Sequence, residues 1–143
     1  MIKRYIFWIK SAIFFQLLTA TMHSISFFNK PVGDNEIEKQ MIDIMTTHKL
    51  NVGAGFTPTF YNIFTGVSVG FSLLFILGGL INIYLIKMKV SDSVWNGIIN
   101  INLFIYGICF ASNLFLTFLP PIICTGLIFL SLLIARITFK KAI

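Results

Sequence analysis

Long apolar stretches, separated by short polar or charged segments, dominate this chain. A helix needs about 20 apolar residues to cross a bilayer core of about 30 Å. The stretch 5–27 meets this requirement with one charge, Lys10, whose long side chain can extend to the membrane surface. The stretch 50–86 carries no charge. Because 51–58 is rich in loop-forming residues, the second helix is predicted over 60–86.

The charge-free stretch 93–135 is too long for one membrane crossing. A single helix of that length would reach about 65 Å at 1.5 Å per residue. The clearest interruption is Pro120-Pro121, because proline lacks a backbone donor and restricts the residue before it. We therefore predict a tight hairpin there, with helices over 94–119 and 122–139. The four stretches together predict an all-α integral membrane four-helix bundle.

The polar segment 28–59 contains a different pattern. Asn35 followed by Glu38 resembles a capping box, a pair that begins many helices. Apolar residues then recur at helical spacing up to His48. We predict a short amphipathic helix over 35–49 in the outer loop, which lies on the outer leaflet or caps the bundle.

The composition favours lipid over water as the solvent of the apolar stretches. Of the 143 residues, 57% are hydrophobic and only 11% are charged, whereas soluble domains carry about a quarter charged residues. The length fits a single transmembrane domain over 1–143. The net charge of +6 is spread beside the apolar stretches and forms no aromatic-basic platform, so no nucleic acid is expected as a partner.

The distribution of basic residues predicts the orientation in the membrane. One set of helix ends is flanked by Lys3, Arg4, Lys87, Lys89, Arg136, Lys140 and Lys141. The opposite side has three lysines, offset by four acidic residues. The positive-inside rule therefore places both termini in the cytoplasm, and the absence of an alternating strand pattern favours the inner membrane of a bacterium. A cleaved signal peptide remains an alternative for the first stretch, although its length favours a retained helix.

Polar residues within the apolar stretches are candidates for function, because polar groups are costly in lipid. At 100° per residue, one side of the first helix carries small and polar residues, namely Ala12, Gln16, Thr19, His23 and Ser26. Two interpretations remain open. The stripe forms hydrogen bonds between helices, or it lines an outward-opening polar cavity, together with His48, that binds a small molecule or a lipid.

Glycines and asparagines of the second and third helices form a candidate packing set. Its members are Gly66, Gly70, Gly78, Asn82, Asn96, Asn100 and Gly107. The Gly-x3-Gly spacing at the start of this set permits close approach of a second helix. In an antiparallel hairpin Asn82 and Asn100 have similar depth, so we predict that they face one another or share a partner.

No catalytic residue and no cofactor are predicted, because the sequence contains no nucleophile elbow, phosphate loop, zinc motif or paired buried carboxylates. His23 and His48 are both expected on the outer side. A haem- or metal-binding membrane oxidoreductase that uses this pair is a weaker alternative, since neither a carboxylate nor a cysteine joins the two imidazoles.

Four stretches of the chain resemble a family of small bacterial four-helix inner-membrane proteins. These stretches are 23–28, 38–49, 62–72 and Leu119-Pro120-Pro121. The resemblance implies the location and the number of helices, but no activity and no ligand. The leading hypothesis is therefore a non-enzymatic accessory or interaction module, whose partners are the bilayer and a membrane protein or a second copy of the chain. The alternative is a small-molecule or lipid-binding carrier.

Overall fold

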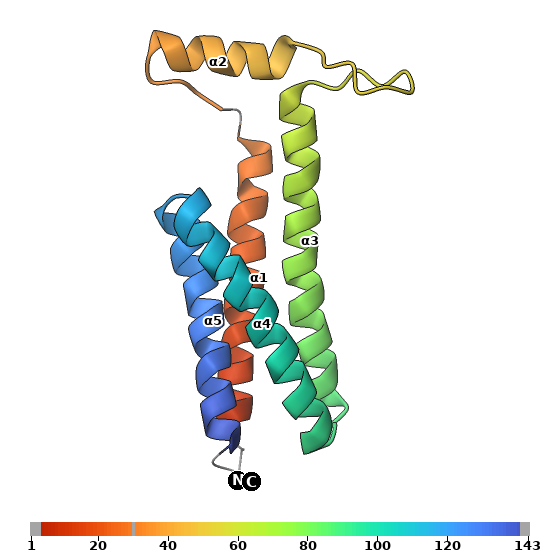
Figure 1. Cartoon of the computed structure of the whole chain (residues 1–143), viewed down its shortest axis with the longest axis vertical. Coiled ribbons are helices and arrows are strands. Elements are labelled where there is room, and N and C mark those ends of the chain that lie inside the picture. Colours follow the sequence, from red (N-terminus) through yellow and green to blue (C-terminus); the bar gives the residue numbers. More distant parts are fainter. Residues whose placement is uncertain (1–3, 30, 141–143) are drawn as a thin grey trace. The chain divides into compact units, whose positions relative to one another are not determined.

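The computed structural model describes residues 4–29 and 31–140 of the chain (Figure 1). Over these residues the chain forms α1 (Arg4–Ile25), the 3-10 turn η1 (Ser26–Phe28), α2 (Glu36–Thr47), α3 (Phe60–Lys87), α4 (Asp92–Leu116) and α5 (Leu119–Lys140). Four of the helices, α1, α3, α4 and α5, are long and apolar enough to cross a membrane. The predicted all-α membrane fold, with a short helix between the first two crossings, is confirmed.

The chain divides into two compact units. One consists of Met1–Ala20 with Leu74–Ile143, and the other of Thr21–Leu73. The first unit therefore holds most of α1, the second half of α3, and all of α4 and α5. The second unit holds the end of α1, the start of α3, and α2 between them.

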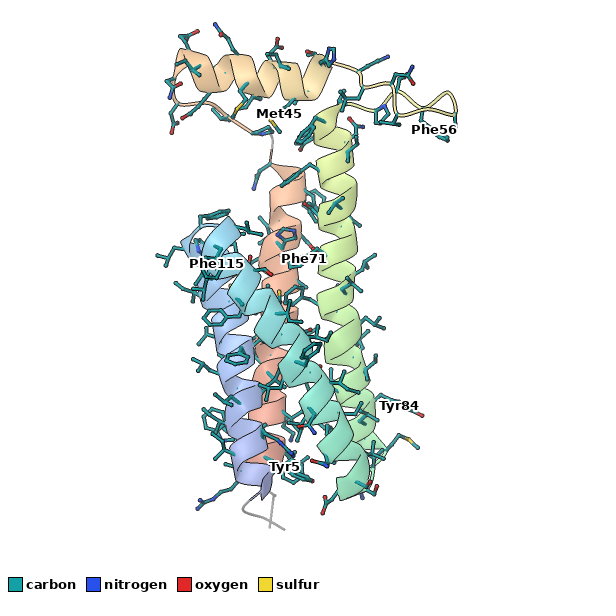
Figure 2. The ribbon with its side chains drawn as sticks, in the orientation of Figure 1. Tyr5, Met45, Phe56, Phe71, Tyr84 and Phe115 are labelled. Atoms are coloured by element: carbon teal, nitrogen blue, oxygen red, sulfur yellow. The ribbon has the colours of Figure 1, made fainter. Side chains whose placement is uncertain are left out.

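An aromatic cluster fixes the start of α1 within the first unit. Tyr5 is 2% exposed, and its ring meets Phe139 of α5 and Trp95 of α4 edge to face, with centroid distances of 4.9 and 6.4 Å. The Tyr5 hydroxyl donates a hydrogen bond of 2.8 Å to Oδ1 of Asp92, in the first turn of α4. Figure 2 shows Tyr5 near the end of the bundle where the chain begins. One side chain thus joins three helices.

The helices α4 and α5 pack through two reciprocal contacts between glycine and phenylalanine. A Cβ atom added at Gly107 of α4 would lie 3.2 Å from the ring of Phe129, and one added at Gly126 of α5 would lie 3.0 Å from the ring of Phe110. The two phenylalanine rings stack, with centroids 5.8 Å apart. Each glycine leaves the space that the aromatic ring of the other helix fills, as small residues commonly do between membrane helices.

The turn between α4 and α5 lies earlier than predicted. α4 ends at Leu116 and α5 already begins at Leu119, so Pro120 and Pro121 belong to the first turn of α5. Proline is tolerated there, because the first backbone N–H groups of a helix have no partner within the helix. The double proline therefore marks the beginning of a helix, while Thr117 and Phe118 form the turn.

Within the second unit, α2 begins with a variant of the predicted capping box, in which the return bond goes to the residue before the N-cap Asn35. Oδ1 of Asn35 accepts the backbone N–H of Glu38 at 2.9 Å, and the Glu38 carboxylate accepts the N–H of Asp34 at 2.7 Å. Beyond α2 the chain forms a short hairpin in which Lys49 pairs with Thr59. The tip of this hairpin carries Phe56, which points away from the helices in Figure 2.

Candidate functional site

The small and polar side of α1 is buried, as its periodicity predicts. Ala12 and Gln16 are fully buried and Thr19 is 9% exposed. On the opposite side, Phe7 and Phe14 are about 60% exposed, which suits side chains that face lipid. The hydroxyl of Thr19 donates to the backbone oxygen one turn earlier at 2.6 Å. Of Ala12, Gln16 and Thr19, Gln16 is therefore the residue that presents a polar group to the other helices of the first unit.

The Gln16 amide lies where α1, α3 and α4 meet. A Cβ atom added at Gly78 of α3 would lie 3.5 Å from Nε2 of Gln16 and 2.8 Å from the hydroxyl oxygen of Tyr106 of α4. At the neighbouring Gly79, the added Cβ would lie 3.7 Å from Oε1 of Gln16. Two successive glycines thus provide the room in which the amide and the phenol lie side by side. We call Gln16, Gly78, Gly79 and Tyr106 the polar junction.

The polar junction contains a buried amide whose hydrogen-bonding groups the described residues satisfy only in part. Neither Nε2 nor Oε1 of Gln16 has a hydrogen-bond partner of normal geometry, although the Tyr106 hydroxyl lies close enough to interact with the amide. Gln16 has no exposed surface. Most buried amides do have partners, because an unsatisfied polar group in an apolar interior costs free energy. The junction carries no charged side chain. Its chemistry therefore suits a neutral group that both donates and accepts hydrogen bonds.

Asn82 does form a pair with an asparagine of α4, but its partner is Asn102 and not the predicted Asn100. Asn82 of α3 is 1% exposed, and its Oδ1 accepts a hydrogen bond of 3.3 Å from Nδ2 of Asn102. Asn100, the predicted partner, lies on the exposed side of α4. The reason is the helical period, since residues two positions apart point about 200° away from one another. The prediction that Asn82 and Asn100 face one another is wrong in its second residue.

The spacing of apolar and aromatic residues in the sequence could have identified Asn102 and Tyr106 as residues on the buried face of α4. With Trp95 and Ile99 they follow the 4-3-4 spacing that keeps residues on one face of a helix. Three of the four, Trp95, Ile99 and Tyr106, are the buried residues of α4. The predicted packing set on this helix, Asn96, Asn100 and Gly107, follows a different face and therefore contains neither Asn102 nor Tyr106.

The remaining members of the predicted packing set differ in their surroundings. Asn96 is exposed and accepts a hydrogen bond from Arg136 of α5. Gly78 and Gly107 each lie against an aromatic side chain of another helix. At Gly66 and Gly70, in contrast, an added Cβ would meet no atom within 4 Å. The Gly-x3-Gly pair therefore makes no close helix contact within the described residues of the second unit.

The two histidines have different environments. The ring of His23 packs edge to face against Phe27 and Phe71, with centroid distances of 5.7 and 5.6 Å. His48 is exposed and forms the C-cap of α2. Among the described residues, no three His, Cys, Asp or Glu side chains gather as metal ligands would. The side chain of Ser26, the last member of the predicted stripe, lies outside the described part of the structure.

The second unit contains an open groove that the sequence analysis did not predict. Its volume is about 310 Å³, and its walls include Phe27, Asn29 and Pro31 on one side and Tyr61, Phe64 and Ser68 on the other. Of the residues predicted to line a polar cavity, the described ones, Gln16, Thr19, His23 and His48, do not belong to its walls. The predicted stripe instead contributes Gln16 to the polar junction of the first unit.

Four apolar helices of sufficient length, with exposed phenylalanines and a mainly hydrophobic interior that holds a few polar side chains, define a multi-pass helical membrane protein. Comparison with protein-family models, with curated proteins and with solved structures finds no match in any of the three. The function proposed for the chain therefore depends on its own residues.

Proposed function

We propose that the chain is a non-enzymatic interaction module of the bacterial inner membrane, and that it binds another membrane helix through the Gly66–Gly70 face of α3. The observation that carries this proposal is the open space beside both glycines. Gly78 and Gly107 lie against aromatic side chains of other helices in the first unit, whereas an added Cβ at Gly66 or Gly70 would meet no atom within 4 Å. Because small residues in membrane helices commonly permit close helix contact, a glycine pair with open space beside it among the described residues suits a partner outside the chain.

The surroundings of this glycine pair suit a helix partner. Val67, between the two glycines, is 68% exposed, and Leu73 one turn further is 58% exposed. Side chains of this kind can form ridges on both sides of a glycine groove, so a second helix gains van der Waals contacts along its length. The partner is a membrane protein or a second copy of this chain. In a two-fold symmetric pair the same face would meet itself.

The ends of the helices support the proposed orientation. α1 begins at Arg4, α3 ends at Lys87, and Arg136 lies near the end of α5. The loop between α1 and α3 carries the offsetting acidic residues. This asymmetry favours cytoplasmic termini and an external loop 28–59.

The test compares two substitutions by isoleucine at glycines with equally open surroundings. Gly70→Ile fills the proposed face, whereas Gly97→Ile adds the same side chain on α4, where an added Cβ also meets nothing within 4 Å. We expect Gly70→Ile to weaken association at least about tenfold, equivalent to about 1.4 kcal/mol. Chemical cross-linking of the tagged full chain in native membranes, followed by mass spectrometry, measures the loss. Both variants should keep the thermal transition of the wild type.

Two outcomes would contradict this proposal. One is a wild-type chain that yields neither cross-linked copies nor a co-captured membrane polypeptide. The other is an equal loss of cross-linked product in Gly70→Ile and Gly97→Ile, since that would show a general effect of bulk in the membrane.

A second candidate function is the binding of a small neutral molecule at the polar junction, and the buried Gln16 amide, which has no hydrogen bond of normal geometry among the described residues, favours it. Gln16→Met keeps a side chain of similar length and removes both hydrogen-bonding atoms. If the junction holds a ligand, native mass spectrometry of protein purified from its own membranes should detect a small molecule with the wild type and little or none with Gln16→Met. Equal small-molecule content in the two proteins would exclude this function.

A further inference from the structure

The helix α2 has an apolar side that the described chain leaves exposed. Ile37, Met41 and Ile44 are 80, 56 and 61% exposed, and their spacing places them on one side of the helix. None of the residues of α2 is buried. Each of these side chains would gain about 1.5–3 kcal/mol if it were fully removed from water. A helix in this position therefore has a strong preference for an apolar surface.

We infer that α2 lies in the membrane–water interface and inserts this apolar side among the lipids, so that it forms a lipid-docking surface beside the crossings. The connections of α2 keep it near the crossings and support a lipid surface as the occupant: the one before it is short, and the one after it is a hairpin whose ends pair at Lys49 and Thr59. The segment 29–35 joins α2 to η1, at the end of α1, and it spans at most about 25 Å even when fully extended. The end of α1 and the start of α3 both belong to membrane crossings.

The arrangement of the second unit agrees with a helix parallel to the membrane. Within this unit α2 lies across the start of α3 (Figure 1). Ile42 and Met45 are half-buried, whereas Ile37, Met41 and Ile44 remain open. The apolar arc of α2 is therefore wider than the part that the protein covers. Lipid chains beside α1 and α3 would cover the rest, which makes the docking surface continuous with the lipid-facing sides of the crossings.

The charges of α2 indicate whether attraction to anionic lipid or burial of apolar side chains holds the helix at the membrane. The helix carries Glu36, Glu38 and Asp43 but one basic residue, Lys39, which pairs with Glu36 at 2.7 Å. Interfacial helices that select anionic lipids carry lysine and arginine on the polar side. α2 lacks this feature, so its binding depends on apolar burial. Docking should therefore be independent of anionic lipid and only weakly sensitive to salt.

Spin labels on the full chain test this inference. In a background with Cys109→Ala and Cys124→Ala, one variant carries Met41→Cys on the apolar side. The matched control carries Asp43→Cys, at an exposed position that points about 160° away from Met41 at 100° per residue. Both are labelled with a nitroxide and placed in lipid nanodiscs. Oxygen concentrates in lipid, whereas a nickel complex stays in water, so their relative accessibility reports the environment of each label. We expect the oxygen-to-nickel ratio to be several-fold higher at position 41 than at position 43, in neutral and in anionic lipid alike.

Four results would overturn the inference. Equal nickel accessibility at both positions would show that α2 is surrounded by water. An immobile label at position 41 that neither reagent reaches would show that protein covers this side. Magnetic broadening between labels at position 41 would show that a second copy covers it. A ratio that rises only with anionic lipid would likewise contradict docking by apolar burial.

Discussion

Gly78→Ala should lower the free energy of unfolding by about 1–3 kcal/mol, the usual cost of an added methyl group in a well-packed interior. The new Cβ atom would lie 2.8 Å from the hydroxyl oxygen of Tyr106, a distance that requires the helices or the phenol to move. Tyr106 is itself 7% exposed, so it has little free space to enter. Denaturation of the full chain in mixed detergent micelles measures the loss.

The expected loss has a specific cause that a second substitution can remove. Tyr106→Phe deletes the hydroxyl oxygen. The nearest remaining atoms to a Cβ at position 78 are then Nε2 of Gln16 at 3.5 Å and the ring carbon Cζ of residue 106 at 3.9 Å. Both are ordinary contact distances. In the Tyr106→Phe background, Gly78→Ala should therefore cost much less than it does in the wild type, and the two substitutions should be strongly non-additive.

The control for this experiment is Gly97→Ala, on the exposed side of α4. An added Cβ there meets nothing within 4 Å, and alanine favours a helix over glycine by about 1 kcal/mol in water. Gly97→Ala should therefore leave the stability unchanged or raise it. If Gly78→Ala were as well tolerated as Gly97→Ala, the close approach at the polar junction would be refuted.

The hydrophobic pattern was sufficient to predict the helices of this chain. Residues 60–86 were predicted as one helix, and α3 runs from Phe60 to Lys87. The pattern specifies such an element because lipid requires every backbone group of a crossing to be satisfied within the helix. The predicted ends of the helices were less accurate. Ser91 caps α4 by accepting the N–H of Val94, so this helix begins at Asp92, ahead of its first apolar residue.

The contacts between helices were harder to predict than the helices themselves. The periodicity of α1 identified Gln16 as an inward-facing residue, but it could not show which residues of α3 and α4 lie opposite. That depends on the rotation and height of each helix, and a shift of two residues exchanges Asn100 for Asn102. The sequence also could not distinguish Gly78, which lies against Tyr106, from Gly66, which lies beside open space. Both glycines occur in equally apolar surroundings along the chain.

Tyr5→Phe should cost about 1.5–3 kcal/mol of stability, the usual contribution of a hydrogen bond to a charged group. The substitution removes the bond of 2.8 Å to the carboxylate of Asp92. It retains the ring that packs against Phe139 and Trp95, so the change isolates the hydroxyl group. The same unfolding experiment in mixed micelles measures the effect. Tyr84→Phe is the matched control, because Tyr84 is 61% exposed and points away from the bundle in Figure 2.

A double-mutant cycle with Asp92→Asn separates the hydrogen bond from other roles of the two side chains. If the bond joins α1 to α4, Tyr5→Phe should cost less in the Asp92→Asn background than in the wild type, since the bond to a neutral amide is weaker than one to a carboxylate. Equal costs in both backgrounds would show that the hydroxyl stabilises the fold by another route. An effect no larger than that of Tyr84→Phe would show that the aromatic packing around Tyr5 is sufficient to hold the start of α1. The expected result makes this bond a polar link between the first and third crossings, close to the end of the bundle where water can reach the carboxylate but not the ring.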